Sequence, residues 1–142
     1  MSAFQILLKV HQWLYETTDG FIGHSLFGTP TLLLRTNGRR SGETRTSALL
    51  YLKNGEGWVV VASKGGSPTA PAWLHNLRAN PEVEVQIGRK RTAVVASEIP
   101  QDDPRHAGLW KSFNDANDGR FDRYQASTTR PIPLVALQPK ES

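Results

Sequence analysis

Two short polar segments of this chain combine glycine, hydroxyl and basic residues in a way that suits anion binding. The first is the segment 37–45, NGRRSGETR, and the second is the segment 62–67, ASKGGS. Glycine lets backbone N–H groups approach a ligand closely, and arginine and lysine supply the charge that attracts phosphates and carboxylates. Two such segments in one small chain predict a site for a small molecule with several negative charges. For either segment alone, a solvated hairpin turn remains the alternative.

Other kinds of chemistry find little support in the sequence. Neither segment matches the phosphate-binding pattern G-x-x-x-x-G-K-[ST] or the dinucleotide pattern G-x-G-x-x-G. The four histidines show no spacing typical of a metal site, and there is no cysteine. Ser63 lies in no G-x-S-x-G pattern, and the pair Asp102–Asp103 resembles residues that open a helix. Cations, hydroxyls and aromatic side chains without an acid–base pair indicate a protein whose cofactor carries out the chemistry.

Length and composition limit the remaining possibilities. A chain of 142 residues fits one domain, and a domain of this size buries about two thirds of its unfolded surface without disulfides. The formal net charge of +4 favours anionic partners, but charge alone does not distinguish a cofactor from nucleic acid or a membrane surface. No apolar run reaches the ~18 residues of a membrane span, and no signal peptide is recognised. We therefore expect a cytoplasmic protein.

An apolar helix is predicted near the N-terminus, over about residues 4–18. Phe4, Leu7, Leu8, Leu14 and Tyr15 form one apolar stripe at helical spacing. Such a helix can pack on its own domain, on a partner subunit or on a membrane surface. Peripheral contact with the inner face of the cell membrane therefore stays open.

The rest of the chain is dominated by strand patterns. Asn54-Gly55 is a typical hairpin turn, and Asn37-Gly38 starts another connection of this kind. The connections are too short for parallel crossovers, so we expect an α+β fold, an antiparallel barrel or sandwich with helices at its edges. The predicted strands cover residues 31–36, 44–52, 57–63, 82–87, 92–99 and 133–138, and the predicted helices cover residues 71–80 and 102–114.

Three motifs, in order along the chain, resemble the deazaflavin-dependent nitroreductase family of actinobacteria, which includes F420H2-dependent quinone reductases. The first motif is GRRSG at 38–42, after the strand that holds Leu32–Leu34 and before Arg45. The second is ASKGG at 62–66, followed by PAWLHNL at 71–77 and Asn80-Pro81. The third is the C-terminal segment with TTR at 128–130. The likeness covers nearly the whole chain from about Gly28.

This resemblance implies a fold, a cofactor and a reaction. The fold is the split antiparallel β-barrel of FMN-binding oxidoreductases, with N-terminal and edge helices, as one reductase domain over residues 1–142. The cofactor is coenzyme F420, a deazaflavin with a phosphate and an oligoglutamate tail, and FMN or FAD are less favoured. The reaction is hydride transfer from reduced F420 to quinones, and in some members to nitro compounds.

The resemblance also implies roles for individual residues. Arg40 and Arg45 match contacts to the tail and phosphate, and Ser63 and Lys64 match contacts to the ring and the adjoining chain. Ser63 and Tyr124 are the expected catalytic residues. The full set expected to bind the cofactor is Arg39, Arg40, Ser41, Arg45, Ala48, Leu50, Val61, Ser63, Lys64, Gly65, Ala72, Trp73 and Asn76. The substrate pocket is expected to comprise Leu50, Leu74, Phe121 and Tyr124.

One departure from the family concerns the substrate pocket. Better-known members carry several tyrosines there, whereas this chain has Leu50, Leu74 and Phe121 and keeps only Tyr124. Fewer phenol donors favour quinones over nitroimidazoles as acceptors. A non-catalytic carrier of a flavin, tetrapyrrole or lipid is the alternative reading of the same barrel. Nucleic acid is not expected because no exposed aromatic residues interleave with the cations, and a homodimer and a monomer both stay open.

Overall fold

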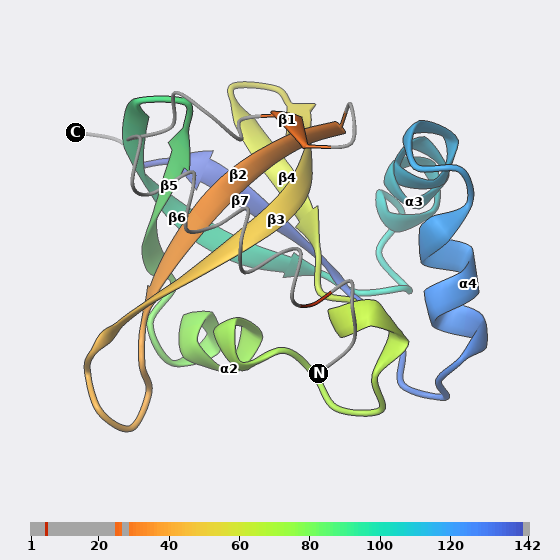
Figure 1. Ribbon diagram of the computed structural model, residues 1–142, viewed down its shortest axis with the longest axis horizontal. Helices are drawn as coiled ribbons and strands as arrows, with labels where there is room; N and C mark the ends of the chain where they lie inside the picture. Colours follow the sequence, from red (N-terminus) through yellow and green to blue (C-terminus); the bar gives the residue numbers. More distant parts are fainter. Residues whose placement is uncertain (1–4, 6–24, 27–28, 141–142) are drawn as a thin grey trace.

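A closed antiparallel barrel forms the centre of the computed structural model, which describes residues 5, 25–26 and 29–140 (Figure 1). The first long strand of the chain, Thr29–Asn37, pairs with the strand Glu82–Ile87, and this pairing closes the ring. A two-residue strand, β1 (Ser25–Leu26), extends one edge. The antiparallel barrel predicted from the sequence is confirmed. In spatial order the barrel strands are β2 (Thr29–Asn37), β3 (Thr44–Asn54), β4 (Gly57–Val61), β7 (Leu134–Pro139), β6 (Lys90–Ile99) and β5 (Glu82–Ile87).

The predicted N-terminal helix over residues 4–18 lies outside the described residues, apart from Gln5. That residue is helical and exposed. Among the described residues, no helix is long and apolar enough to cross a membrane.

The barrel interior is filled by every second side chain of its strands. Leu32, Leu34, Val60 and Val94 are all fully buried there. Helix α2 (Ala72–Ala79) covers one end of the barrel, as Figure 1 shows, and buries three large side chains against the interior. Full burial of one such side chain stabilises the fold by roughly 1.5–3 kcal/mol, so α2 is firmly fixed to the barrel.

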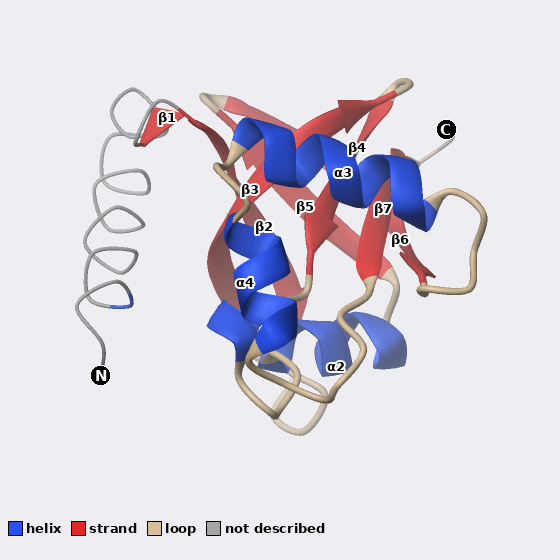
Figure 2. Cartoon of the chain, turned by 90° about the vertical axis from the view of Figure 1, so that its right-hand side faces the viewer, coloured by secondary structure: helices blue, strands red, loops and turns tan. Residues whose placement is uncertain are grey.

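A second apolar core lies on the outer surface of β4 and β7. Helices α3 (His106–Ala116) and α4 (Arg120–Ala126) cover it (Figure 2). The rings of Phe113 and Phe121 meet edge to face there, with centroids 5.5 Å apart. Helix α4 was not predicted from the sequence, because seven residues are too few to establish a helical period. Helix α3 begins only at His106, later than the predicted start at residue 102.

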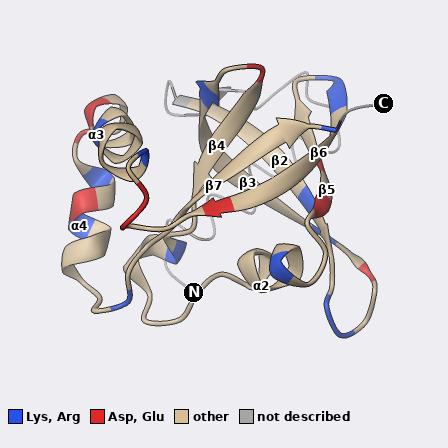
Figure 3. Cartoon of the chain, turned by 180° about the vertical axis from the view of Figure 1, so that it is seen from behind, with Lys and Arg blue, Asp and Glu red and all other residues tan. Residues whose placement is uncertain are grey.

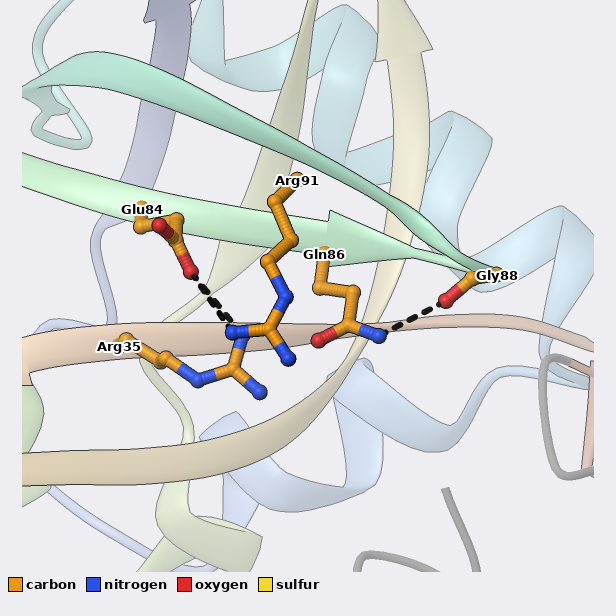
Figure 4. Close-up of polar contacts among 5 residues, drawn as sticks. All are labelled: Arg35, Glu84, Gln86, Gly88 and Arg91. Atoms are coloured by element: carbon orange, nitrogen blue, oxygen red, sulfur yellow. Dashed lines mark hydrogen bonds and ion pairs between the residues drawn. The ribbon is translucent and has the colours of Figure 1, made fainter. Parts of the chain in front are cut away.

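Polar side chains join β2 to β5 on the outside of the barrel, where the ring closes (Figure 4). Arg35 donates to the Glu84 carboxylate at 3.2 Å, and Arg91 lies 3.8 Å from the same carboxylate. The Gln86 side chain donates to the carbonyl of Gly88 at 3.0 Å. Half-exposed ion pairs of this kind stabilise by only about 0–1 kcal/mol, so their main effect is to fix the register of β2 on β5.

Candidate active site

An apolar cavity of about 460 Å³ opens where β3 and β4 meet the 62–67 loop and helix α4. Residues of β3 and β4 form one wall, and the loop, with its 3₁₀ turn η1 (Lys64–Gly66), forms another. The fold thus gathers residues that are up to 119 positions apart in the sequence, from Gln5 to Tyr124. Of the predicted site residues, it brings together here Ala48, Leu50, Val61, Ser63, Lys64, Gly65, Trp73, Phe121 and Tyr124.

A second, basic cavity of about 280 Å³ adjoins the first. The β2–β3 hairpin, which carries the blue Lys and Arg segments of Figure 3, and the first turns of α2 line it. Ser47 and Trp73 line both cavities, so the two are neighbouring parts of one groove. Of the predicted residues, Arg39, Arg40, Ser41, Arg45, Ala72, Trp73 and Asn76 lie in this basic part.

Asn76 connects the basic hairpin to α2 through its buried side-chain amide. Its Oδ1 accepts the backbone N–H of Arg39 at 3.1 Å, and its Nδ2 donates to the Thr36 hydroxyl at 3.2 Å. Asn76 is 4% exposed and Thr36 is 1% exposed. The amide therefore fixes the position of the arginine-bearing turn, in addition to lining the cavity.

Within the hairpin, the arginines remain close to solvent. The Arg45 guanidinium lies 3.4 Å from the Glu43 carboxylate, and both side chains are more than half exposed. Ser41 accepts the backbone N–H of Glu43 through its hydroxyl at 3.1 Å, which tightens the turn. An exposed pair of this kind is weak, so Arg45 can turn to an anionic ligand at little cost.

The 62–67 loop has an unusual backbone. Ser63 is in the right-handed helical region (φ −86°, ψ −35°), whereas Lys64 has φ +44° and Gly65 has φ +64°. A left-handed conformation costs a non-glycine residue roughly 1–2 kcal/mol, and such strain concentrates at functional sites. Gly66, also at positive φ, lies so close to Tyr124 of α4 and to Ser127, just after that helix, that a Cβ atom would collide with both.

Helix α4 carries the two aromatic residues that cover the apolar cavity. The ring of Tyr124 meets that of Phe121 edge to face, with centroids 5.8 Å apart. Phe121 is 4% exposed and belongs to the outer core, whereas Tyr124 is only half-buried. No hydrogen bond to the Tyr124 hydroxyl occurs within the described residues, so that group can serve a ligand.

The placement of two predicted residues differs from expectation. Leu74, expected in the substrate pocket, is 1% exposed and packs in the barrel core, because it lies on the inward face of α2. Ala72, whose backbone the family resemblance implies at the edge of the ring, lines the basic cavity instead. The sequence analysis missed Arg120 and Ser47, which line the apolar cavity. Neither belonged to a recognisable motif, and Arg120 opens the helix that was not predicted.

Nearby cations affect the titration of His75 on α2. Burial lowers the pKa of His75, and the charges of Arg39, Arg78 and Lys64 lower it further. No cluster of three or more potential metal ligands occurs among residues 5, 25–26 and 29–140. The groove therefore combines an aromatic, apolar end with a cationic end, which suits a flat ring that carries an anionic chain.

Fold and groove together define an oxidoreductase-type split barrel built to hold an aromatic, anionic cofactor. The family model of F420H2-dependent quinone reductases matches residues 7–139. An F420H2-dependent quinone reductase of Mycobacterium tuberculosis strain H37Rv is 46% identical over 132 residues, covering 92% of this chain and 89% of that protein. The chain therefore belongs to the F420H2-dependent quinone reductase family, whose cofactor is coenzyme F420.

Solved structures agree with this assignment. A structure of an F420H2-dependent reductase is 34% identical, with a TM-score of 0.68, and covers 77% of this chain and 94% of its own. A structure described as a domain-swapped dimer is 29% identical, with a TM-score of 0.70, and covers 96% of this chain and 100% of its own. The expected split-barrel fold, enzyme class and cofactor are confirmed.

Proposed function

We propose that the apolar cavity holds the ring of reduced F420, that the adjoining basic cavity holds its phosphate and oligoglutamate tail, and that a quinone binds beneath α4. The adjacency of the two cavities, which share Ser47 and Trp73 as lining residues, carries this proposal. A planar ring would lie against apolar walls, while the anionic chain would reach Arg39, Arg40 and Arg45.

The chain's own residues would bind and orient the reactants. When bound, reduced F420 supplies a hydride from its ring, and the quinone takes up this hydride and one proton to become a quinol. Trp73, 6% exposed and fixed in the barrel core, provides a rigid wall against which two rings can align. Leu50 and Phe121 keep water away from that surface, because their side chains are apolar.

Two hydroxyl groups are available for positioning or proton delivery. Ser63 is 8% exposed and lines the cavity, and no hydrogen bond to its hydroxyl occurs within the described residues. We assign Ser63 to an oxygen or nitrogen atom of the ring and Tyr124 to an oxygen of the acceptor. Solvent can deliver the proton that completes the quinol, so no strong general acid is required.

A direct titration tests the cofactor assignment. We expect the purified protein to bind F420 more tightly than flavin mononucleotide, because the basic cavity suits a long anionic tail. Fluorescence titrations measure both affinities. Equal or tighter binding of the flavin would contradict the proposal.

Substitution of the hairpin arginines tests where the tail binds. A hydrogen bond to a charged group contributes roughly 1.5–3 kcal/mol, so Arg40→Ala and Arg45→Ala should each weaken F420 binding by about 10- to 100-fold. The wild-type affinity should also fall with added salt, because exposed ion pairs are screened. Arg105→Ala is the matched control, since its guanidinium pairs with Asp103 and lines neither cavity. Unchanged F420 affinity in both hairpin variants would exclude a role of Arg40 and Arg45 in binding the tail.

The acceptor preference follows from the apolar mouth of the cavity. Polar groups buried without partners cost roughly 1–3 kcal/mol each, which disfavours a nitroimidazole that needs several hydrogen bonds. We expect kcat/KM for a menaquinone analogue to exceed that for a nitroimidazole by at least about tenfold, equivalent to ~1.4 kcal/mol. Leu50→Tyr should narrow this ratio by returning a phenol to the cavity. Comparable activity of the wild-type enzyme on both substrates would refute this view of the pocket.

Two further expectations concern partners. The N-terminal segment, for which packing on the domain, on a partner subunit and on a membrane surface all stay open, lies outside the described residues apart from Gln5, and vesicle cosedimentation of the full chain tests the membrane contact. A monomer and a homodimer both stay open, and light scattering of the purified protein distinguishes them.

A further inference from the structure

Arg130 holds the 62–67 loop from the side of the C-terminal segment. Its guanidinium donates to three backbone carbonyls, those of Ala62 at 3.2 Å, Ser63 at 2.9 Å and Ser67 at 3.2 Å. One rigid, planar group thus fixes three peptide oxygens of a loop more than 60 residues earlier in the chain. Bonds from a charged donor are roughly twice as strong as neutral ones.

The charge of Arg130 is not neutralised by an acidic residue of the described chain. Carbonyl dipoles are its hydrogen-bond partners there, and burial lowers its pKa, with a smaller contribution from the charge of Arg78. A partly buried guanidinium keeps its proton under all ordinary conditions. Its field therefore acts on the peptide groups that it contacts.

The N–H bonds of these same peptide groups are important for binding. In a trans peptide the C=O and N–H bonds point in opposite directions, and no described peptide bond is cis. When Arg130 binds the oxygens of Ala62 and Ser63, the N–H groups of Ser63 and Lys64 therefore point away from it. No acceptor for the backbone N–H of Ser63, Lys64 or Gly65 occurs among the described residues.

The backbone of these three residues also has the shape of an anion-binding nest. A right-handed residue followed by a left-handed one turns successive N–H groups into one concavity. Ser63 has φ −86°, and Lys64, which follows it, has φ +44°. All three residues line the apolar cavity, so the nest lies at the proposed ring site.

We propose that Arg130 is a positioning residue, which holds the peptide groups of residues 62–64 so that the nest faces the cavity and binds a negatively polarised oxygen of the cofactor. The charge of Arg130 draws electron density toward the carbonyls and makes the opposite N–H groups better donors. This inference rests on the proposed function. A carbonyl oxygen of the ring and an oxygen of the phosphate share the chemistry that the nest recognises.

The segment that carries Arg130 is itself held in place. Gln125 donates to the carbonyl of Arg130 at 2.9 Å and accepts the backbone N–H of Ile132 at 3.0 Å. Ser127 donates through its hydroxyl to the carbonyl of Gly66 at 3.3 Å. The loop and the segment behind it therefore form one preorganised unit, which lowers the entropic cost of binding.

Two substitutions and a matched control test the proposal. Arg130→Gln removes the charge, and Arg130→Lys keeps the charge but loses the planar fork. Arg123→Gln is the control, because that arginine also donates to a backbone carbonyl, of Asp118 at 2.6 Å, but lines neither cavity. Each variant is titrated with F420 and with the ring-only deazaflavin, which lacks the phosphate and tail.

We expect Arg130→Gln to weaken F420 binding by at least about tenfold and Arg130→Lys to weaken it less, with Arg123→Gln close to the wild type. If the nest holds a ring oxygen, the ring-only compound loses affinity by the same factor. If the nest holds the phosphate, only complete F420 loses affinity. Wild-type affinity of Arg130→Gln for both ligands would overturn the proposal.

Hydrogen exchange supplies a second readout, and its wild-type part does not depend on a folded variant. In the wild-type protein, the amides of Ser63, Lys64 and Gly65 should exchange rapidly and become protected when F420 binds. In Arg130→Gln this protection should be lost, even at a saturating cofactor concentration. Absence of protection in a wild-type protein that binds F420 and reduces quinones would overturn the nest alone, whereas absence of F420 binding would refute the proposed function.

Discussion

The buried amide of Asn76 offers a sharp test of how the basic hairpin is positioned. Asn76→Ala removes two hydrogen bonds, to the Arg39 N–H at 3.1 Å and to the Thr36 hydroxyl at 3.2 Å. A neutral hydrogen bond contributes about 0.5–1.5 kcal/mol, and a buried group left without a partner costs about 1–3 kcal/mol. Thr36 is 1% exposed, so water cannot easily replace the lost partner.

We therefore expect Asn76→Ala to lower the free energy of unfolding by about 2–3 kcal/mol, measured by urea denaturation. For a chain of this size each kcal/mol lowers Tm by roughly 2–4 °C, so Tm should fall by about 4–12 °C. Asn80→Ala is the matched control, because Asn80 is exposed and its side chain, within the described part of the chain, accepts a single hydrogen bond, from the Glu82 N–H at 3.3 Å. Its effect should stay within about 0.5 kcal/mol.

The functional consequence should be confined to the basic cavity. In Asn76→Ala the hairpin loses its attachment to α2, so F420 affinity should fall by about tenfold, the effect of ~1.4 kcal/mol. Binding of the ring-only deazaflavin should change little, because the ring's cavity does not include Asn76. A stability equal to that of Asn80→Ala, together with unchanged F420 affinity, would refute the positioning role.

Three further predictions concern the charges around the groove. Glu43→Gln should strengthen F420 binding by about two- to fivefold, because it frees Arg45 from a competing carboxylate. The control, Glu56→Gln in the β3–β4 turn, should have no effect. A loss of affinity of Glu43→Gln in the fluorescence titration would contradict this prediction. The pKa of His75 is lowered by burial and then by nearby cations. The contribution of His75 to stability is therefore retained above the unfolded-state pKa and lost as the pH falls below that value. Binding of the anionic tail should raise the pKa of His75, and an NMR titration that shows no rise on F420 binding would refute the proposed location of the tail. Lys64→Gly should raise stability by roughly 1 kcal/mol, because glycine tolerates the left-handed backbone, yet weaken F420 binding; a drop in Tm would show that the backbone is not strained there.

Much of the fold could be predicted from the sequence because its strands are local patterns. The alternation of Glu82–Ile87 gave a strand with the same bounds as β5, and Asn54-Gly55 marked the β3–β4 turn. Pro71 and Asn80-Pro81 bounded α2 within a residue or two. These features depend on backbone dihedral preferences and side-chain period, which neighbouring residues determine. The arginines of the hairpin and the glycines of the loop were found for the same reason, since each group lies in one short segment.

Tertiary structure alone decided how these segments combine. The barrel closes through the pairing of β2 with β5 and of β4 with β7, contacts between strands far apart in the sequence that no local pattern encodes. Closure places Leu74 in the core instead of the substrate pocket, and it makes Ser47 and Trp73 shared walls of the two cavities. The three carbonyls bound by Arg130 likewise meet it only in the folded chain. Residue types therefore defined the chemistry in advance, whereas long-range packing decided which of those residues meet in one site.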